Sequence, residues 1–372
     1  MSRMMRKRNL IAILALSAAL LLCARGAAAS CTVLVFDFED RSAGRDSAWV
    51  GPALADFLIN TLTVDARCKA VPRLAVKYHS AGGALPFERK WELLDAMKAD
   101  VLVEGSYSVK GGAMSFQGTV VRTADSDIQD ISFSLNPFSP QAARKRLLDS
   151  IGKILKIEFK NNSDATPGAR SEKAYEAYWK ADAALGRGDA ARADTLLSEA
   201  LAQDPAMAAA CALRGRILLE SADYDKAAER LEKCLSVNAD YPDTHYYLGQ
   251  VYAAQKKLAA ARTHLRAAAD ARPANPLFQW KLGAFYRESS VFDKALDTLN
   301  KAVSLDAALA PAWYELALIH AYAKNRDKAL GNLGKAVKLG GGGIADMART
   351  APEFEWLRRD TRFFDILRSA PR

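Results

Sequence analysis

The sequence contains few of the residues, and none of the motifs, that usually carry catalysis or bind a metal ion. Only 4 of its 372 residues are histidine and 5 are cysteine. No C-x-x-C, H-E-x-x-H or G-x-S-x-G motif occurs, and no set of Cys and His residues has the spacing of zinc ligands. We therefore expect a protein that is not an enzyme and that has no catalytic residue, cofactor or metal ion.

Two features could suggest chemistry, and both have simpler interpretations. The glycine run at residues 340–343 is not followed by the Lys and Ser/Thr of a phosphate-binding loop, so it predicts a flexible turn. Asp37, Glu39 and Asp40 stand where a first strand should end, a position that can bind metal or substrate in open α/β sheets. Because no motif supplies a partner for these acids, we favour a solvated loop with a helix-capping acid. A hydrolase or metal enzyme is the less favoured alternative.

The one long apolar run extends from Leu10 to Leu22. It is shorter than the ~20 residues that a transmembrane helix needs. Basic residues precede it and Ala27 and Ala29 form an A-x-A site, so residues 1–29 are predicted to be a cleavable signal peptide. We expect a soluble, periplasmic mature chain without a transmembrane helix. Lipid attachment at Cys31 is the alternative. It is less favoured because Arg25 interrupts the apolar residues that should precede a lipidated cysteine.

The charge of the chain is only weakly positive once this segment is removed. The full sequence has 52 Lys and Arg against 43 Asp and Glu, a formal net charge of +9. Five of the positive charges lie in the predicted signal peptide, which leaves +4 (9 − 5). No basic stripe of the kind that follows a phosphate backbone is present, so nucleic acid is not an expected partner.

The chain changes character at the polar stretch KNNSDATPGARSEKA, residues 160–174. Its Pro-Gly pair predicts a linker. Segments with strand and helix periodicity alternate before this stretch, and almost everything after it has helix periodicity. The predicted organisation is a domain at residues 30–158, a linker at 159–173, a solenoid at 174–343 and capping helices at 344–372.

The second half repeats with a period of 34 residues. Leu248-Gly249 recurs as Leu282-Gly283, and a small residue recurs at Ala193, Ala227, Ala261, Ala295 and Ala329. Two antiparallel helices approach closely only where side chains are small, which explains these positions. The pattern resembles the tetratricopeptide repeat (TPR). The resemblance implies five helix pairs, at residues 174–207, 208–241, 242–275, 276–309 and 310–343.

Apolar periodicity in the first half predicts the order β-α-β-α-β-β-β-α. The expected segments are a strand at 32–40, a helix at 47–66, a strand at 69–74, a helix at 87–99, three antiparallel strands from about residue 101 to 135, and a helix that begins at Ser139. The fold class is therefore an α/β amino-terminal domain with a mixed sheet, followed by an all-α TPR solenoid.

The first domain also resembles a known family. Its opening strand TVLVFDFED and the later ADVLVEGS, residues 99–106, are similar to segments of the TolB amino-terminal domain family. The curli-secretion lipoprotein CsgG and the flagellar protein FlgO have related domains. The resemblance covers about residues 32–157 and implies an assembly and interaction module in an exported bacterial envelope protein.

The TPR resemblance also implies a binding surface. First-helix positions 2, 5, 9, 12 and 13 face the concave side in such solenoids, and aromatic residues recur here at position five. The candidate partner-binding residues are Tyr175, Tyr178, Asp182, Arg216, Glu220, Tyr246, Gln250, Trp280, Arg287, Tyr314 and Tyr322, with Glu288 beside them. Tyr, Trp and Arg are typical of binding hot spots. The alternative is that the aromatic residues pack between neighbouring first helices and stabilise the stack.

Four cysteines remain after the predicted cleavage. Cys31 precedes the first predicted strand and Cys68 the second. If these strands are parallel neighbours, their starts lie about 5 Å apart, within reach of a disulfide in an exported chain. The other two cysteines, Cys211 and Cys234, could pair within the second half. Because Cys234 replaces a small packing residue of its repeat, we favour buried thiols over a bridge between them.

These features together predict a non-enzymatic periplasmic scaffold or adaptor. It would bind a protein or peptide partner in an aromatic-lined TPR groove and serve envelope assembly. The alternative is a lipidated component of an outer-membrane secretion or appendage apparatus resembling CsgG, with peripheral association to that membrane.

Overall fold

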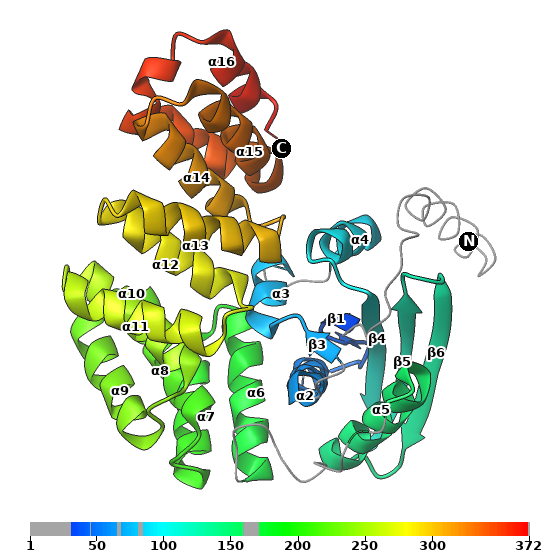
Figure 1. The fold of residues 1–372 in the computed structure, drawn as a ribbon. Helices are drawn as coiled ribbons and strands as arrows, with labels where there is room; N and C mark the ends of the chain where they lie inside the picture. The colour runs from blue at the N-terminus through cyan, green and yellow to red at the C-terminus, as the bar shows by residue number, and fades with distance from the viewer. Residues whose placement is uncertain are drawn as a thin grey trace. The chain divides into compact units, whose positions relative to one another are not determined.

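The computed structural model describes residues 31–44, 46–64, 68–80, 85–157, 159 and 171–370. The predicted signal peptide and most of the predicted linker lie outside these residues. The chain divides into two compact units, Met1–Met207 and Ala208–Arg372. This division falls after the first predicted helix pair and not in the predicted linker. Each unit is described by itself below (Figure 1).

The first unit contains a mixed sheet, as expected. Its strands are β1 (Cys31–Val35), β2 (Glu39–Asp40), β3 (Cys68–Ala70), β4 (Val101–Lys110), β5 (Ala113–Arg122) and β6 (Asp127–Leu135). They are ordered β3-β1-β4-β5-β6, and β2 also pairs with β4. β1 runs parallel to both β3 and β4, whereas β4, β5 and β6 form the predicted antiparallel meander.

Four helices accompany the sheet: α2 (Val50–Val64), α3 (Arg73–Ser80), α4 (Phe87–Ala96) and α5 (Pro140–Leu155). Ser139 caps α5 as predicted, because its side chain accepts a hydrogen bond from the backbone N–H of Ala142. The strand predicted at 69–74 is wrong in its second half. Pro72 has no backbone N–H to donate to a strand ladder. Its carbonyl instead accepts hydrogen bonds from the backbone N–H groups of Ala75 and Val76 in the first turn of α3.

The predicted acid cluster at the end of the first strand is held by contacts within this unit. Asp37 pairs with Arg73, and Glu39 pairs with Arg41. Asp40 accepts hydrogen bonds from the hydroxyl of Ser47 and the backbone N–H of Ser42. Among the described residues, no three His, Cys, Asp or Glu side chains gather in a way that could hold a metal ion. The acids therefore organise the turn between β2 and α2.

Ten helices follow in pairs: α6 (Glu172–Gly186), α7 (Ala190–Gln203), α8 (Ala208–Glu220), α9 (Tyr224–Val237), α10 (Pro242–Ala254), α11 (Leu258–Ala271), α12 (Pro276–Glu288), α13 (Phe292–Leu305), α14 (Ala310–Tyr322) and α15 (Arg326–Thr350). The 3-10 helix η2 (Pro352–Leu357) and α16 (Thr361–Arg368) come after them. The TPR-like solenoid is thus confirmed. The turn expected at residues 340–343 is also present, because two helices meet within α15 at a kink at Gly341, whose φ of 62° and ψ of −151° are not helical.

The backbone itself repeats every 34 residues. The turn between the two helices of each pair contains one residue with positive φ, at Gly188, Ala222, Lys256, Ser290 and Lys324. Only the first of these is the glycine that such a conformation favours. The other four positions adopt the left-handed conformation without glycine, so the packing of the helix pair imposes this turn on the residues present.

Close approach between the helices of a pair depends on glycine at one position. A Cβ atom added to Gly249 would lie 2.7 Å from Cγ and 2.9 Å from the backbone nitrogen of Leu265. Gly215 and Gly283 meet Leu231 and Leu299 in the same way. These distances are shorter than van der Waals contact. In these three pairs the helices can therefore approach this closely only because the position is glycine.

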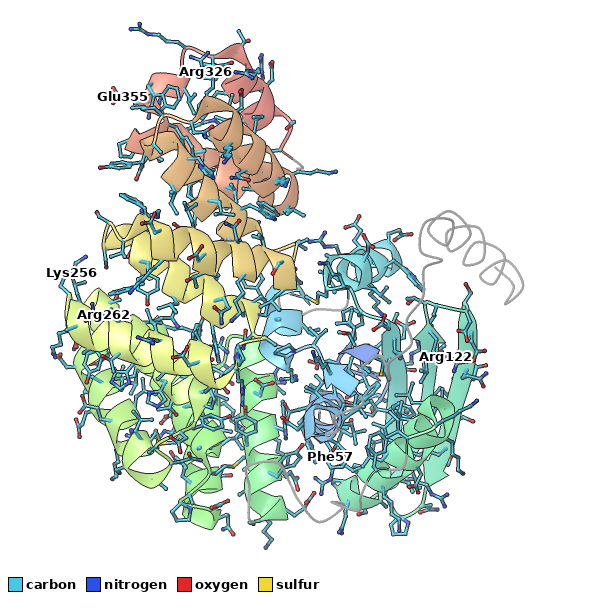
Figure 2. The ribbon with its side chains drawn as sticks, viewed as in Figure 1. Phe57, Arg122, Lys256, Arg262, Arg326 and Glu355 are labelled. Carbon is cyan, nitrogen blue, oxygen red and sulfur yellow. A yellow bond between two sulfur atoms is a disulfide. The ribbon has the colours of Figure 1, made fainter. Side chains whose placement is uncertain are left out.

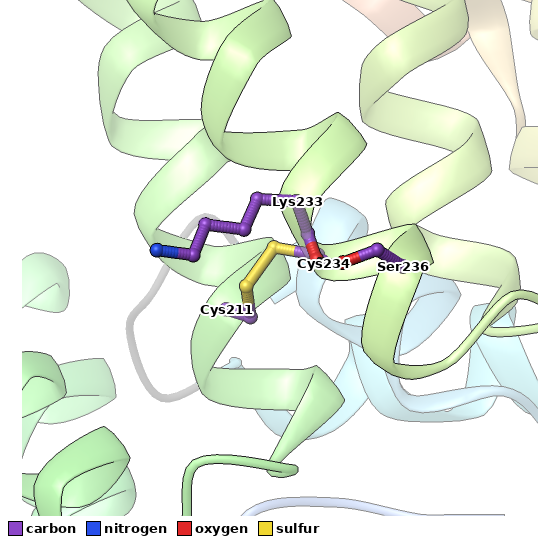
Figure 3. The surroundings of a disulfide bond; sticks show 4 residues. All are labelled: Cys211, Lys233, Cys234 and Ser236. Atoms are coloured by element: carbon purple, nitrogen blue, oxygen red, sulfur yellow. Dashed lines mark hydrogen bonds between the residues drawn. A yellow bond between two sulfur atoms is a disulfide. The ribbon is translucent and has the colours of Figure 1, made fainter.

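Cys211 on α8 and Cys234 on α9 form a disulfide, with their Cα atoms 5.8 Å apart (Figure 3). The prediction of two buried thiols is therefore wrong. Cys234 is buried and Cys211 is half-buried, and the bond joins the two antiparallel helices of one pair. Cys31 is also disulfide-bonded, and its Cα partner across the parallel strands is Cys68. The side chain of Cys68 lies outside the described residues, so the Cys31–Cys68 bond stays a prediction that the register supports.

Replacing both Cys211 and Cys234 by serine is expected to lower the free energy of unfolding by roughly 3 kcal/mol, because the bond closes a loop in the unfolded chain. Urea unfolding followed by circular dichroism measures this difference. The denatured wild-type protein should not be alkylated at either cysteine without reductant. Alkylation at both would contradict the bond.

Gly249→Ala is expected to lower the free energy of unfolding by roughly 1–3 kcal/mol, because the new methyl group overpacks against Leu265. Gly331→Ala is the matched control, since a Cβ atom there would meet nothing within 4 Å. It should raise the stability by about 0.5–1 kcal/mol through helix propensity. Equal effects of the two substitutions would refute the packing argument.

Candidate functional site

The predicted groove residues of the first helix pair are not available to a partner. Tyr175 on α6 is 2% exposed and donates a hydrogen bond to the carbonyl of Ala53 on α2 over 3.0 Å. Asp182 is buried and lies 3.6 Å from the guanidinium of Arg73 on α3. Tyr178 is half-buried against the same core. The assignment of Tyr175 and Asp182 to an open groove is therefore wrong, because the α/β part of the first unit covers them.

Arg73 is the centre of this contact. Its guanidinium lies 2.8 Å from Asp37 and stacks 4.5 Å from the ring centroid of Trp179 on α6. Burial alone would lower the pKa of Arg73, but the carboxylates of Asp37 and Asp182 outweigh it and raise that pKa above its usual value. The side chain therefore stays charged and fixes α6 against the sheet domain.

A second buried arginine supports the same helix. Arg144 on α5 pairs with Glu172 at the start of α6 over 2.7 Å. Its guanidinium also lies 5.4 Å from the ring of Phe57, which Figure 2 labels, and 5.1 Å from the ring of Tyr175. Both rings belong to the core of the first unit. The first predicted repeat is thus a structural part of that unit.

Two position-five aromatics of the second unit are also packed. Tyr246 is 7% exposed, with its ring 4.8 Å from that of Phe278. Tyr314 is 5% exposed and packs on Phe354 of η2, in a core that includes Phe363 of α16. These two tyrosines therefore follow the predicted alternative, in which position-five aromatics stabilise the stack.

Four of the predicted residues lie on α12 and α14: Trp280, Arg287, Glu288 and Tyr322. Together with Lys281 and Glu315 on the same helices they form a set that we call the α12–α14 site. Trp280 and Arg287 are seven residues apart on α12, and Glu315 and Tyr322 are seven apart on α14. This spacing places each pair on one side of its helix. An ion pair between Arg287 and Glu315 joins the two rows.

Aromatic and charged groups alternate within the α12–α14 site. The ammonium of Lys281 lies 4.2 Å from the ring centroid of Trp280, which is half-buried. The side chain of Glu288 lies 3.4 Å from the guanidinium of Arg287. Tyr322 is 63% exposed and stacks on Phe292, with ring centroids 4.8 Å apart. A large amphipathic surface is therefore held in place before any partner binds.

The charges of this site are partly removed from water. Burial raises the pKa of Glu315, and the Arg287 guanidinium opposes that shift. Burial also lowers the pKa of Lys281, which Glu315 and Glu288 oppose. The ion pair between Arg287 and Glu315 is thus only slightly exposed, and in such a setting it is stronger than in water, whereas the side chain of Glu288 is 63% exposed.

Three predicted polar residues, Arg216, Glu220 and Gln250, lie on the earlier helices of the second unit. Arg216 on α8 pairs with Glu220 one turn later over 2.7 Å. Gln250 on α10 donates a hydrogen bond to the carbonyl of Tyr246 over 3.5 Å. Sequence reasoning missed Lys281, Glu315 and Phe292. The signal that could have found the first two is the pair of opposite charges at position six of successive repeats.

The comparisons with known proteins agree with the repeat architecture. Two family models described as tetratricopeptide repeat match residues 184–233 and 212–276. Over 134 residues, the chain is 28% identical to anaphase-promoting complex subunit 3 of Schizosaccharomyces pombe. This match covers 36% of this chain and 20% of that protein. The predicted TPR resemblance is confirmed over the matched residues.

Two solved structures that are similar to part of the chain are the following. MamA of Desulfovibrio magneticus is 23% identical, with a TM-score of 0.40 over 46% of this chain and 97% of its own. A thermophilic TPR protein of Thermus thermophilus is 20% identical, with a TM-score of 0.40 over 52% and 98%. Within the described residues, no helix combines the length and apolar character needed to cross a membrane.

Tyr314→Ala is expected to lower the free energy of unfolding by about 3 kcal/mol, because it removes a buried ring from the core around Phe354. Tyr322→Ala, eight residues later on the same helix, should cost about 1 kcal/mol or less, since it loses one exposed stacking contact. Urea unfolding compares the two variants. A larger loss for Tyr322→Ala would show that the assignment of packed and accessible tyrosines is reversed.

Proposed function

We propose that this protein is a non-enzymatic scaffold that binds a protein or peptide partner through the α12–α14 site. The observation that supports this most directly is the ion pair between Arg287 and Glu315. It joins the row of Trp280 and Arg287 on α12 to the row of Glu315 and Tyr322 on α14. Trp, Tyr and Arg bury much area with few rotatable bonds, and a desolvated setting strengthens their polar contacts. TPR proteins in general act as scaffolds for protein interactions.

The proposed compartment is the periplasm, and the proposed role is envelope assembly. The basic, apolar and A-x-A segments of residues 1–29 support export. The Cys211–Cys234 disulfide supports it independently, because such bonds persist in oxidising compartments. The similarity of residues 32–157 to the TolB amino-terminal family supports an interaction module in the first unit.

The lipidated outer-membrane alternative requires a thioether at Cys31. The sulfur of Cys31 is disulfide-bonded in the structure, and a sulfur in a disulfide cannot also carry a lipid. This favours the soluble periplasmic form. Mass spectrometry of the mature amino terminus distinguishes the two, since acylation adds the mass of the lipid at Cys31.

The binding proposal is tested by affinity capture from a periplasmic extract. The bait variant combines Trp280→Ala with Tyr322→Ala, which removes two aromatic rings of the site. The matched control combines Val237→Ala with Leu258→Ala, which removes two apolar side chains that are each 55% exposed, on α9 and α11. All proteins are first shown to unfold at similar urea concentrations.

Partner recovery should fall at least about tenfold with the site variant, because truncating a hot-spot residue typically costs 2 kcal/mol or more. The control should recover the partner as the wild type does. Equal recovery by the site variant and the wild type would show that the partner binds elsewhere.

A further inference from the structure

Two of the histidines face each other between the helices of one pair. His245 on α10 and His264 on α11 are both half-buried, and their Nδ1 atoms lie 2.9 Å apart. Their ring centroids are 5.2 Å apart and the ring planes are inclined by 26°. Because the two nitrogens are much closer together than the ring centroids, they are turned toward each other. This is the geometry of a hydrogen bond between the rings.

The positions of the protons in this pair follow from its contact with the backbone. The Nε2 atom of His245 lies 2.8 Å from the carbonyl oxygen of Ala239, which can only accept a hydrogen bond. His245 therefore carries a proton on Nε2, and in its neutral form its Nδ1 atom is an acceptor. His264 must then donate from Nδ1, which leaves its own Nε2 atom without a proton.

The pair can take up one further proton without losing a contact, but not two. The first binds to Nε2 of His264, and the Nδ1–H group of that ring still donates to His245. A second proton can bind only to Nδ1 of His245. Two N–H groups, each on a positively charged ring, would then point at each other over 2.9 Å. The doubly protonated rings therefore have to separate.

The charges near the pair come from neighbouring helices. Glu232 on α9 interacts with His264 and accepts a hydrogen bond from the hydroxyl of Tyr252 on α10. The ring of Tyr252 lies 5.5 Å from that of His264, and the ammonium of Lys257 lies 5.5 Å from the Tyr252 ring on its other contact. Among the described residues, neither α8 nor α12, which also pack against this helix pair, adds a charge that acts on His264.

These charges do not compensate for the cost of protonation. Burial lowers the pKa of His264 and His245 lowers it further, while Glu232 opposes the shift without reversing it. Such a histidine binds its proton less readily in the folded chain than in the unfolded one. Its contribution to stability is therefore complete above the unfolded pKa of about 6.5 and is lost as the pH falls. Asp243 and Arg272, which pair over 3.3 Å, are a second charged contact between the same helices.

We propose that His245 and His264 form an acid-sensitive contact between α10 and α11. Above about pH 6.5 the pair is neutral, and its hydrogen bond joins the two helices. As the pH falls, the second proton drives the rings apart and increases the population in which α10 and α11 are locally open. This inference does not depend on the α12–α14 site or on the partner proposed for it.

Hydrogen exchange of the full chain, followed by mass spectrometry at about pH 7.5 and about pH 5, measures this opening once the intrinsic pH dependence of exchange is removed. In the wild type, the open population of α10 and α11 should rise at least about tenfold at the lower pH, the factor that corresponds to one pKa unit. His264→Asn should remove most of this rise, because its amide can still donate to His245 but takes up no proton.

His320→Asn is the matched control. His320 on α14 is another histidine whose pKa burial lowers, but it has no part in this pair. Its variant should open α10 and α11 in acid as the wild type does. An equal acid response in the wild type and in His264→Asn overturns the inference, as does a loss of the response in His320→Asn.

Nitrogen-15 spectra of the histidine rings give an independent test on the wild-type protein. At about pH 7.5, His245 should carry its proton on Nε2 and His264 on Nδ1. A neutral pair with both protons on Nε2 overturns the inference, because no hydrogen bond could then join the two Nδ1 atoms.

Discussion

Steric contact between a glycine and a leucine sets how closely the helices approach in three of the helix pairs of the second unit. Gly215, Gly249 and Gly283 leave no room for a Cβ atom beside the leucine of the following helix. The pair of α14 and α15 has the buried Ala317 at this position, so a small side chain suffices there. The ion pair between Arg287 on α12 and Glu315 on α14 then joins the two rows of the candidate site.

The helix α6 has the sequence of a repeat and the environment of a domain core. Its Tyr175 and Trp179 belong to the same buried cluster as the residues of the sheet and of α2. Arg73 and Arg144 secure it with ion pairs at Asp182 and Glu172. The face of α6 that resembles a partner-binding surface is therefore buried against other parts of the first unit.

The sequence predicts those features that depend on contacts within one repeat or one strand pair. The 34-residue period, the meander of β4, β5 and β6, and the parallel register of Cys31 with Cys68 are local in this sense. The residues that cover a given surface, in contrast, can lie far away in the sequence. The predicted groove tyrosines look alike in sequence, but Tyr175 is covered by Ala53, 122 residues away, and Tyr314 by Phe354. Burial of these rings could not be read from the pattern.

The place of α6 in the core also makes the folding of the sheet depend on the repeat region. The sheet and the helices α2 to α5 are complete in sequence by Leu155, yet their core includes Tyr175 and Trp179 of α6. Domains generally fold as units. A chain cut between α5 and α6 would therefore expose apolar surface that α6 covers in the intact protein.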